Sequence, residues 1–375
     1  MSIVSIISSS SGTAPGAPTI GTATAGSTSA TVTYTAPTYT GKGTGTVTYT
    51  ATSSPGGFTG TGASPITVSG LTNGTAYTFT VKATTSYGVT GPSSAASNSV
   101  TPVAKPVVTG GTLTSDATYY YRTFTSSGTL GVTNATLTAD ILLVAGGGNG
   151  ANSQDYNCCG YRVVNIGGGG GAGGLVYSAS QSLTVANYTV TIGAGGGNNS
   201  SFTGLTTAVG GGYGANNCSG APGGSGGGAG NYTISGFPPF VSTRAGGVGT
   251  AGQGNNGGAS WTDRTNAKGG GGGGAGSVGQ AAGSGNAGAG GSGSSVFLSS
   301  YAGGGGGGNY CGGGGGASSG GGAGGANYAG GSAATANTGG GGGGSGRPAS
   351  LNTGIAGGNG ASGITIVRYT KAQVD

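Results

Sequence analysis

Short stretches of alternating polar and apolar residues dominate the first part of the chain. The segment ATVTYTAP alternates small or polar positions with apolar ones, and TGTVTYTATSSPGG repeats this pattern before a Ser-Pro-Gly-Gly turn. Two further runs flank the Asn73-Gly74 turn, and SAASNSVTP closes the unit. A period of two residues is typical of strands with one buried face, so these strands predict an all-β sandwich over residues 14–102.

The block GLTNGTAYTFTVKA resembles the fibronectin type III family, in which a Leu precedes a buried Tyr by six residues. Leu71 and Tyr77 occupy these positions, and the resemblance implies that Tyr77 forms the tyrosine corner. SYGVTGPSSAASNSVTP is similar to the last hairpin and strand of that family. The chain departs from the family in its second strand, where Tyr34 replaces the usual Trp. We expect this domain to act as a spacer or, alternatively, to bind a partner.

Two prolines in PVAKPVV predict a stiff linker over residues 103–111. A second domain is expected over 112–375, with alternating strands at 112–209, a glycine body at 210–360 and a closing strand at 361–370. Because strands bracket the glycine body at both ends, we expect this domain to close on itself.

The glycine content of the chain determines what structure we expect for this second domain, since 99 of the 375 residues of the whole chain are Gly. Glycine has no side chain to bury, so hydrogen bonds between close-packed backbones are the available stabilisation. Extended helices with three residues per turn suit such packing, and the sequence predicts packed polyglycine-II helices with a flexible linker as the alternative. The longest runs stand at 167–171, 269–274, 303–308, 312–316 and 339–344.

The glycine-rich part also resembles the glycine-rich domains of phage tail proteins. The resemblance rests on DILLVAGGG, GGGGGAGGLVYSASQSLTVANYTVTIGAGG, SSFTGLTTAVGGG and SGITIVRY. It covers roughly residues 112–370. It implies a receptor-binding adhesin at a tail-fibre tip, in which polyglycine helices stack as a sandwich and loops at its end recognise the host. A fold transfers more readily than a role.

Missing residue types argue against catalysis. The chain has no His and no Glu, and its five carboxylate side chains are scattered Asp residues. General acid–base chemistry and metal sites draw on clusters of these groups. We therefore expect no enzyme, no metal and no cofactor. The cations lie singly from Lys42 to Lys371, without the basic cluster that nucleic-acid binding needs.

The segment MSIVSIISSSSG matches neither a signal peptide nor a membrane span. We expect a virion-surface protein that is assembled in the host cytoplasm and is extracellular after release. Residues 1–13 are then a peptide that docks on other virion proteins through Ile3–Ile7, or a frayed terminus. The fibronectin-like domain is the other candidate contact with virion proteins.

Recognition is expected in the loops that interrupt the glycine runs, at 152–165, 231–244 and 259–268. Aromatic and Arg side chains dominate binding hot spots, and exposed aromatic rings stack on sugars. The partner is expected to be a host cell-surface glycan or an outer-membrane protein. The alternative is that the same aromatics cap the glycine layers. The candidate residues are Tyr156, Tyr161, Arg162, Tyr232, Phe237, Phe240, Arg244, Trp261, Asp263 and Arg264.

The cysteines Cys158, Cys159, Cys218 and Cys311 all interrupt the glycine-rich part. Their spacing does not match zinc sites. An extracellular protein permits disulfides, so we expect a bridge from the vicinal pair to Cys218 or Cys311, with free thiols as the alternative.

Three functions remain after these exclusions. A receptor-binding tail-fibre adhesin is the first, and a purely structural virion component, such as a capsid decoration or fibre subunit, is the second. A secreted bacterial matrix or fibre protein is a more distant third. The sequence leaves open whether the chain forms a homo-oligomer.

Overall fold

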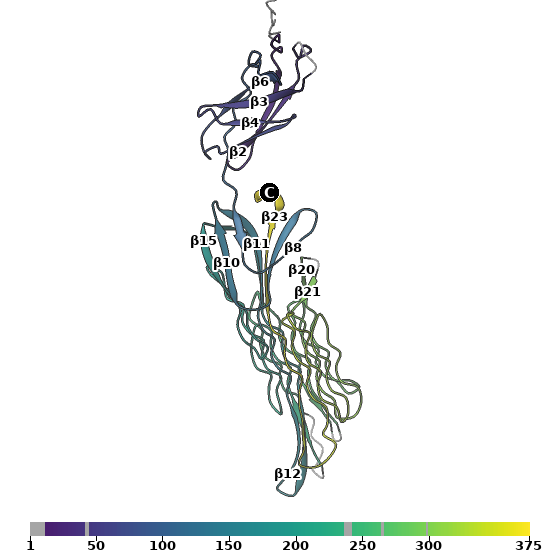
Figure 1. Cartoon of the computed structure of the whole chain (residues 1–375). Helices are drawn as coiled ribbons and strands as arrows, with labels where there is room; N and C mark the ends of the chain where they lie inside the picture. The colour runs from purple at the N-terminus through teal and green to yellow at the C-terminus, as the bar shows by residue number, and fades with distance from the viewer. Residues whose placement is uncertain (1–11, 42–44, 236–241, 264–265, 298) are drawn as a thin grey trace, which may run out of the picture. The chain divides into compact units, whose positions relative to one another are not determined.

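The computed structural model describes residues 12–41, 45–235, 242–263, 266–297 and 299–375 (Figure 1). The chain divides into two compact units, Met1–Lys105 and Pro106–Asp375, and each is described by itself. The expected docking peptide Ile3–Ile7 lies outside the described residues. Within the described ranges, no helix has the length and apolar character needed to cross a membrane.

The first unit is a β-sandwich of two antiparallel sheets. One sheet has the order β1-β2-β5 and the other the order β4-β3-β6. Buried residues alternate along the strands as the period of two predicted, and their side chains form one core between the sheets. The strands are β1 (Thr19–Ala25), β2 (Ser29–Thr35), β3 (Val47–Ser54), β4 (Thr59–Thr61), β5 (Ile66–Ser69) and β6 (Thr78–Thr85).

Tyr77 is buried beside Leu71 in this core, and its hydroxyl oxygen accepts a hydrogen bond of 3.1 Å from the N–H of Thr72. The expected tyrosine corner is therefore confirmed. Tyr34, which stands in the usual Trp position, packs against the same core with its ring 4.7 Å from that of Tyr49. Its hydroxyl donates to the carbonyl of Gly62, so the smaller aromatic is still anchored.

The expected last strand of this unit is replaced by an irregular segment. The side-chain oxygens of Ser94 and Ser97 accept hydrogen bonds from the N–H groups of Val81 and Phe79. Their own N–H groups donate to the carbonyls of the same two residues. The serine side chains thus take up backbone groups that a regular ladder would use. Among the described residues, the end of the expected last strand forms a single bridge, between Tyr77 and Val100.

The second unit contains another β-sandwich. Its sheets have the orders β16-β15-β10-β7 and β14-β11-β23-β9-β8. β7 lies inside the segment expected as a linker, because it pairs with the edge of β10. The strands are β7 (Val107–Thr109), β8 (Thr112–Ser115), β9 (Tyr119–Phe124), β10 (Gly128–Thr133), β11 (Leu137–Val144), β14 (Leu175–Leu183), β15 (Ala186–Thr191), β16 (Ser201–Phe202) and β23 (Ile364–Thr370).

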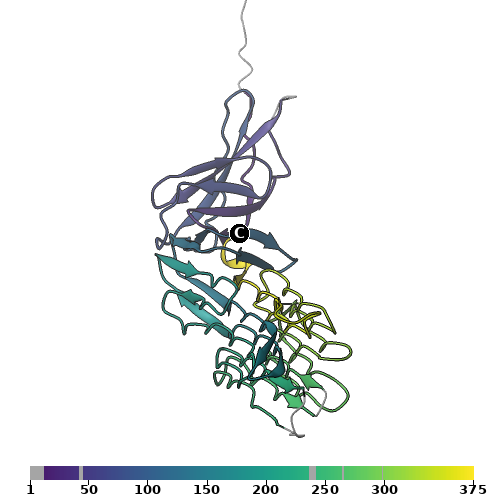
Figure 2. The same ribbon diagram turned by 90° about the horizontal axis from the view of Figure 1, so that it is seen from below.

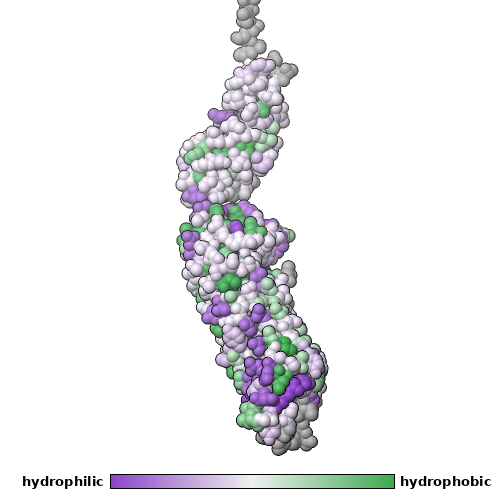
Figure 3. Space-filling model, turned by 60° about the horizontal axis from the view of Figure 1, so that its bottom comes forward, coloured by the Kyte–Doolittle hydropathy of each residue, from purple (hydrophilic) through white to green (hydrophobic). Residues whose placement is uncertain are grey.

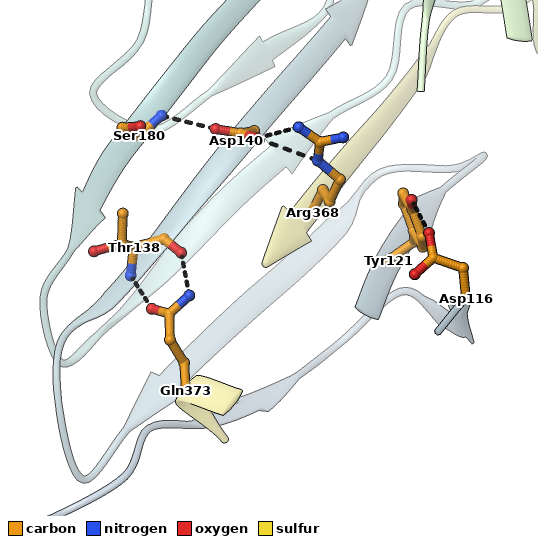
Figure 4. A network of polar contacts seen from close by, with 7 residues as sticks. All are labelled: Asp116, Tyr121, Thr138, Asp140, Ser180, Arg368 and Gln373. Carbon is orange, nitrogen blue, oxygen red and sulfur yellow. Dashed lines mark hydrogen bonds and ion pairs between the residues drawn. The ribbon is translucent and has the colours of Figure 1, made fainter. Parts of the chain in front are cut away.

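The closing strand β23 lies in the middle of its sheet, between β11 and β9. Both faces of this sheet are covered, one by the sandwich core and the other by a second apolar cluster, which explains the unbroken apolar run in β11. Arg368 on β23 donates two hydrogen bonds to Asp140 on β11, at 2.5 and 3.2 Å (Figure 4). In the 3₁₀ helix Lys371–Gln373, the Gln373 amide pairs with both backbone groups of Thr138.

The glycine body consists of extended segments that lie side by side without forming strands (Figures 1 and 2). Along 167–174, successive N–H groups donate to three neighbouring segments in turn, so each neighbour is reached again after three residues. Gly168 and Gly171 donate to Ala215 and Gly212, Gly169 and Ala172 to Gly270 and Gly273, and Gly170 and Gly173 to Gly342 and Gly339. Carbonyl groups of 167–174 accept from three other segments, at 145–151, 225–228 and 305–308.

This packing leaves no room for side chains. A Cβ atom added to Gly170 would lie 2.1 Å from the carbonyl oxygen of Gly148, and one on Gly169 would lie 2.2 Å from that of Gly305. Neighbouring backbones approach each other directly, and each one satisfies the polar groups of the next. Glycine is therefore required here by the close approach of backbones.

We predict that Gly170→Ala unfolds the glycine-rich unit or costs at least about 3 kcal/mol, because the methyl group would overlap a fixed backbone oxygen. Gly316→Ala is the matched control, since nothing lies within 4 Å of a Cβ at that position. It should change stability by less than about 0.5 kcal/mol. Urea unfolding followed by the fluorescence of Trp261, the single Trp of the chain, reports on this unit. Equal stability of the two variants would contradict the conclusion that close backbone packing requires glycine at position 170.

Asp140 should make the folding stability of the second unit sensitive to acid. Burial raises the pKa of its carboxyl group, but hydrogen bonds from the Ser180 N–H and from Arg368 outweigh burial and lower the pKa overall. This stabilisation is present above the unfolded pKa of about 3.9 and is lost as the pH falls through the folded value. Asp140→Asn should therefore be less stable than wild type at pH 7 by about 1–2 kcal/mol, and the difference should shrink towards pH 3. A difference independent of pH would contradict this assignment.

Candidate functional site

A small antiparallel sheet, here called the tip sheet, lies at the end of the glycine-rich unit farthest from its β-sandwich (Figure 1). Its order is β17-β13-β12-β22. On the surface of this end, strongly hydrophilic and hydrophobic residues stand side by side (Figure 3). The strands are β12 (Ser153–Cys158), β13 (Tyr161–Ile166), β17 (Asn231–Ile234) and β22 (Gly354–Ile355).

The hairpin between β12 and β13 ends in a two-residue turn. Cys158 pairs with Tyr161, and the intervening Cys159 and Gly160 have φ of 55° and 83°. Positive φ at both positions matches the twist of a tight hairpin. The turn leaves Tyr161 exposed, with 38% of its surface accessible. This hairpin therefore presents an aromatic ring and two thiols to solvent.

An ion pair fixes the hairpin from within. Asp155 on β12 is 1% exposed, and Arg162 on β13 donates to both of its carboxylate oxygens, with Nε at 3.0 Å from each. The hydrogen bond to Asp155 raises the pKa of the Arg162 guanidinium above its usual value against the opposing effect of burial. Arg162, predicted from the sequence to contact a receptor, is thus held by an internal carboxylate, although about a third of its side chain remains accessible.

The described parts of the loops 231–244 and 259–268 meet at β17. The Thr262 hydroxyl donates to the carbonyl of Tyr232 at 3.2 Å, and the N–H of Ser260 donates to the carbonyl of Arg244 at 3.0 Å. The Arg244 guanidinium lies 5.6 Å from the centre of the Tyr232 ring. Since β17 also pairs with β13, the two loops and the hairpin belong to one layer. Three loops distant in sequence are therefore brought together.

Trp261 belongs to a second short hairpin, formed by β18 (Trp261–Thr262) and β19 (Ala267–Lys268). The ammonium group of Lys268 lies 4.8 Å from the Trp261 ring centre and donates to the carbonyls of Gly283 and Ser284. Lys268 is only 3% exposed, so this buried cation is compensated by the indole face and two carbonyls. One face of Trp261 is consequently occupied inside the protein.

The remaining predicted residues have mixed placements. Asp263 accepts a hydrogen bond of 2.7 Å from the N–H of Asn266 and so helps to close its turn. Tyr156 lines a cavity of about 320 Å³ together with Asp155 and Thr353. Three of the predicted residues, Phe237, Phe240 and Arg264, lie outside the described residues.

Sequence reasoning missed a cluster that continues this layer. Arg347 lies 4.5 Å from the ring centre of Tyr310 and 5.5 Å from that of Tyr328. Tyr310 packs against the buried Val164 and Ile166 of β13. The sequence did carry a signal for this cluster, the same one that identified the other loops. Tyr310, Tyr328 and Arg347 each interrupt a glycine run.

The cysteines differ from the expected bridge. Cys158, Cys159, Cys218 and Cys311 are all free and exposed. The sulfur atoms of Cys158 and Cys159 are 3.6 Å apart, which exceeds the S–S bond length of about 2.05 Å. The vicinal pair belongs to the hairpin turn, whereas Cys218 and Cys311 lie on other loops. The four cysteines are free thiols in this structure, which was the alternative to the expected bridge. Within the described ranges, no three His, Cys, Asp or Glu residues are grouped for a metal.

Comparison with known proteins agrees with this architecture. The family model of the fibronectin type III domain matches residues 14–100, and that of the glycine-rich domain matches residues 123–370. No curated protein matches the chain. The glycine-rich match spans more than half of the sequence. The chain therefore belongs to the glycine-rich domain family and carries a fibronectin type III domain ahead of that region.

Proposed function

We propose that this protein is a phage virion-surface adhesin, with no enzymatic activity, that recognises a host cell surface through the tip sheet and its adjoining loops. The observation that carries the proposal is the convergence of the hairpin and of the described parts of the loops 231–244 and 259–268 at one end of the glycine-rich unit. Exposed Tyr161 and partly exposed Tyr156, Tyr232 and Trp261 stand in this layer. Aromatic side chains supply much of the binding energy of recognition surfaces.

The glycine body supports the tip as a framework. We infer that its extended segments are polyglycine-II helices. The support is the period of three in the hydrogen bonds along 167–174, which equals the three residues per turn of that helix. Bonds to neighbours on all sides restrict movement of any one segment. A framework of this kind holds the loops in place before binding, which lowers the entropic cost of recognition.

The rest of the proposed assignment concerns attachment. The fibronectin type III domain serves as a spacer or as a contact with other virion proteins, and the first residues of the chain extend that contact. The scattered charge leaves no basic cluster for nucleic acid. The absence of His and Glu from the sequence supports a binding role over a catalytic one.

Cell binding tests this function. We expect the purified, fluorescently labelled full chain to bind host cells and to block adsorption of the phage. Tyr161→Ala and Trp261→Ala should each weaken cell binding about tenfold, which corresponds to a loss of about 1.4 kcal/mol at a contact residue. The measurement is the concentration that gives half-maximal cell labelling, compared with that of wild type.

Tyr87→Ala is the matched control, because Tyr87 is an exposed tyrosine (67%) of the fibronectin type III unit. It should bind cells as wild type does. Thermal unfolding of all variants identifies any loss caused by misfolding. If wild-type protein neither binds cells nor blocks infection, the adhesin assignment is wrong and a purely structural virion component takes its place.

A further inference from the structure

A polar groove of about 530 Å³ lies beside the tip sheet, at the point where β12 leaves the glycine body. Glycine and alanine residues line it together with amide residues and one tyrosine. This volume falls in the range of small-molecule sites. The lining residues are Asn149, Gly150, Ala151, Asn152, Gln154, Tyr213, Gly214, Asn216, Ala356, Gly357 and Asn359.

Tyr213 provides a fixed aromatic surface in this groove. Its side chain is 51% exposed, yet its hydroxyl donates a hydrogen bond of 2.7 Å to the carbonyl of Gly196. The ring is therefore held in one orientation while part of its face stays in water. An aromatic face of this kind packs on the C–H groups of a sugar ring. Ordering the ring in advance reduces the entropy lost on binding.

Two amide side chains are oriented by the backbone. The Oδ1 atoms of Asn149 and Asn152 accept hydrogen bonds of 2.9 Å from the N–H groups of Gly360 and Gly357. Each Nδ2 group then has two donors to offer, and no side chain or carbonyl in the described ranges accepts from either of them. Sugar hydroxyl oxygens are suitable acceptors for these donors.

Asn216 carries a buried acceptor beside the groove. Its side chain lines the groove, and its Oδ1 atom is buried without a hydrogen bond from any described residue. Because this oxygen is shielded from solvent, a ligand in the groove does not reach it in this structure. The groove thus offers amide donors and an aromatic face, which match the hydroxyl oxygens and the apolar C–H faces of a saccharide.

Charge selects among saccharides. None of the lining residues is ionisable near neutral pH, and the nearest carboxylate in sequence, Asp155, is paired with Arg162. A uronic acid or sialic acid would lose its hydration here without gaining a cation. We propose that the groove binds a neutral saccharide. This deepens the proposed function by naming a ligand class, and rests on that function only for the cellular source of the sugar.

The test uses the full chain and saturation-transfer NMR with a panel of neutral disaccharides that carry glucose, galactose, mannose, N-acetylglucosamine or N-acetylgalactosamine. We expect at least one to bind with millimolar or better affinity, and its uronic acid counterpart to bind at least tenfold more weakly. Asn152→Ala and Tyr213→Ala should each weaken binding tenfold or more. Tyr213→Phe, which keeps the ring, should retain most of the affinity.

Tyr87→Ala is the matched control, because Tyr87 is an exposed tyrosine of the fibronectin type III unit and does not line the groove, and it should bind the disaccharide as wild type does. Failure of every neutral sugar to bind, or equal binding by Tyr213→Ala and wild type, would overturn the saccharide assignment. Cell labelling separates the two proposals: protein that labels cells but binds no sugar keeps the adhesin function and loses this groove. Protein that binds sugar but labels no cells keeps the groove assignment and loses the adhesin function.

Discussion

The close approach of glycine backbones is the constraint on which the second unit depends. Each segment of the body uses its N–H and C=O groups to bond to neighbouring segments, and an added Cβ at Gly169 or Gly170 would overlap their carbonyl oxygens. Hydrogen bonding therefore replaces the apolar side-chain contacts that stabilise most domains. Ordering so much glycine costs conformational entropy, and a lattice that satisfies backbone groups in several directions offsets that cost.

The β-sandwich of the same unit closes this lattice. β11 enters the body from the sandwich and β23 returns from it, so the two strands bring the beginning and the end of the glycine segments together. Their apolar residues are buried on both faces, and the Asp140–Arg368 pair joins them at one end. Conventional packing thus anchors the glycine segments at one end, and the tip sheet gathers them at the other.

The tip separates residues that maintain structure from residues that remain available for contact. Arg162, Arg244 and Lys268 each engage an internal carboxylate, amide or carbonyl, or an aromatic face. The occupied faces of the aromatic side chains maintain the tip, and the proposed recognition concerns the faces that stay exposed. The groove beside Tyr213 differs, because its amide groups are oriented by backbone contacts while donors remain unused.

The sequence by itself determined the two domains, the strands that bracket the glycine body and the tyrosine corner at Tyr77, because strand periodicity and these motifs are local. It also identified the interrupting loops. Only the tertiary structure decided which loops meet, since glycine runs are nearly identical and carry no side-chain code for their neighbours. The Asp155–Arg162 pair and the groove around Tyr213 were likewise beyond the sequence, because their residues become neighbours only through hydrogen bonds between distant segments.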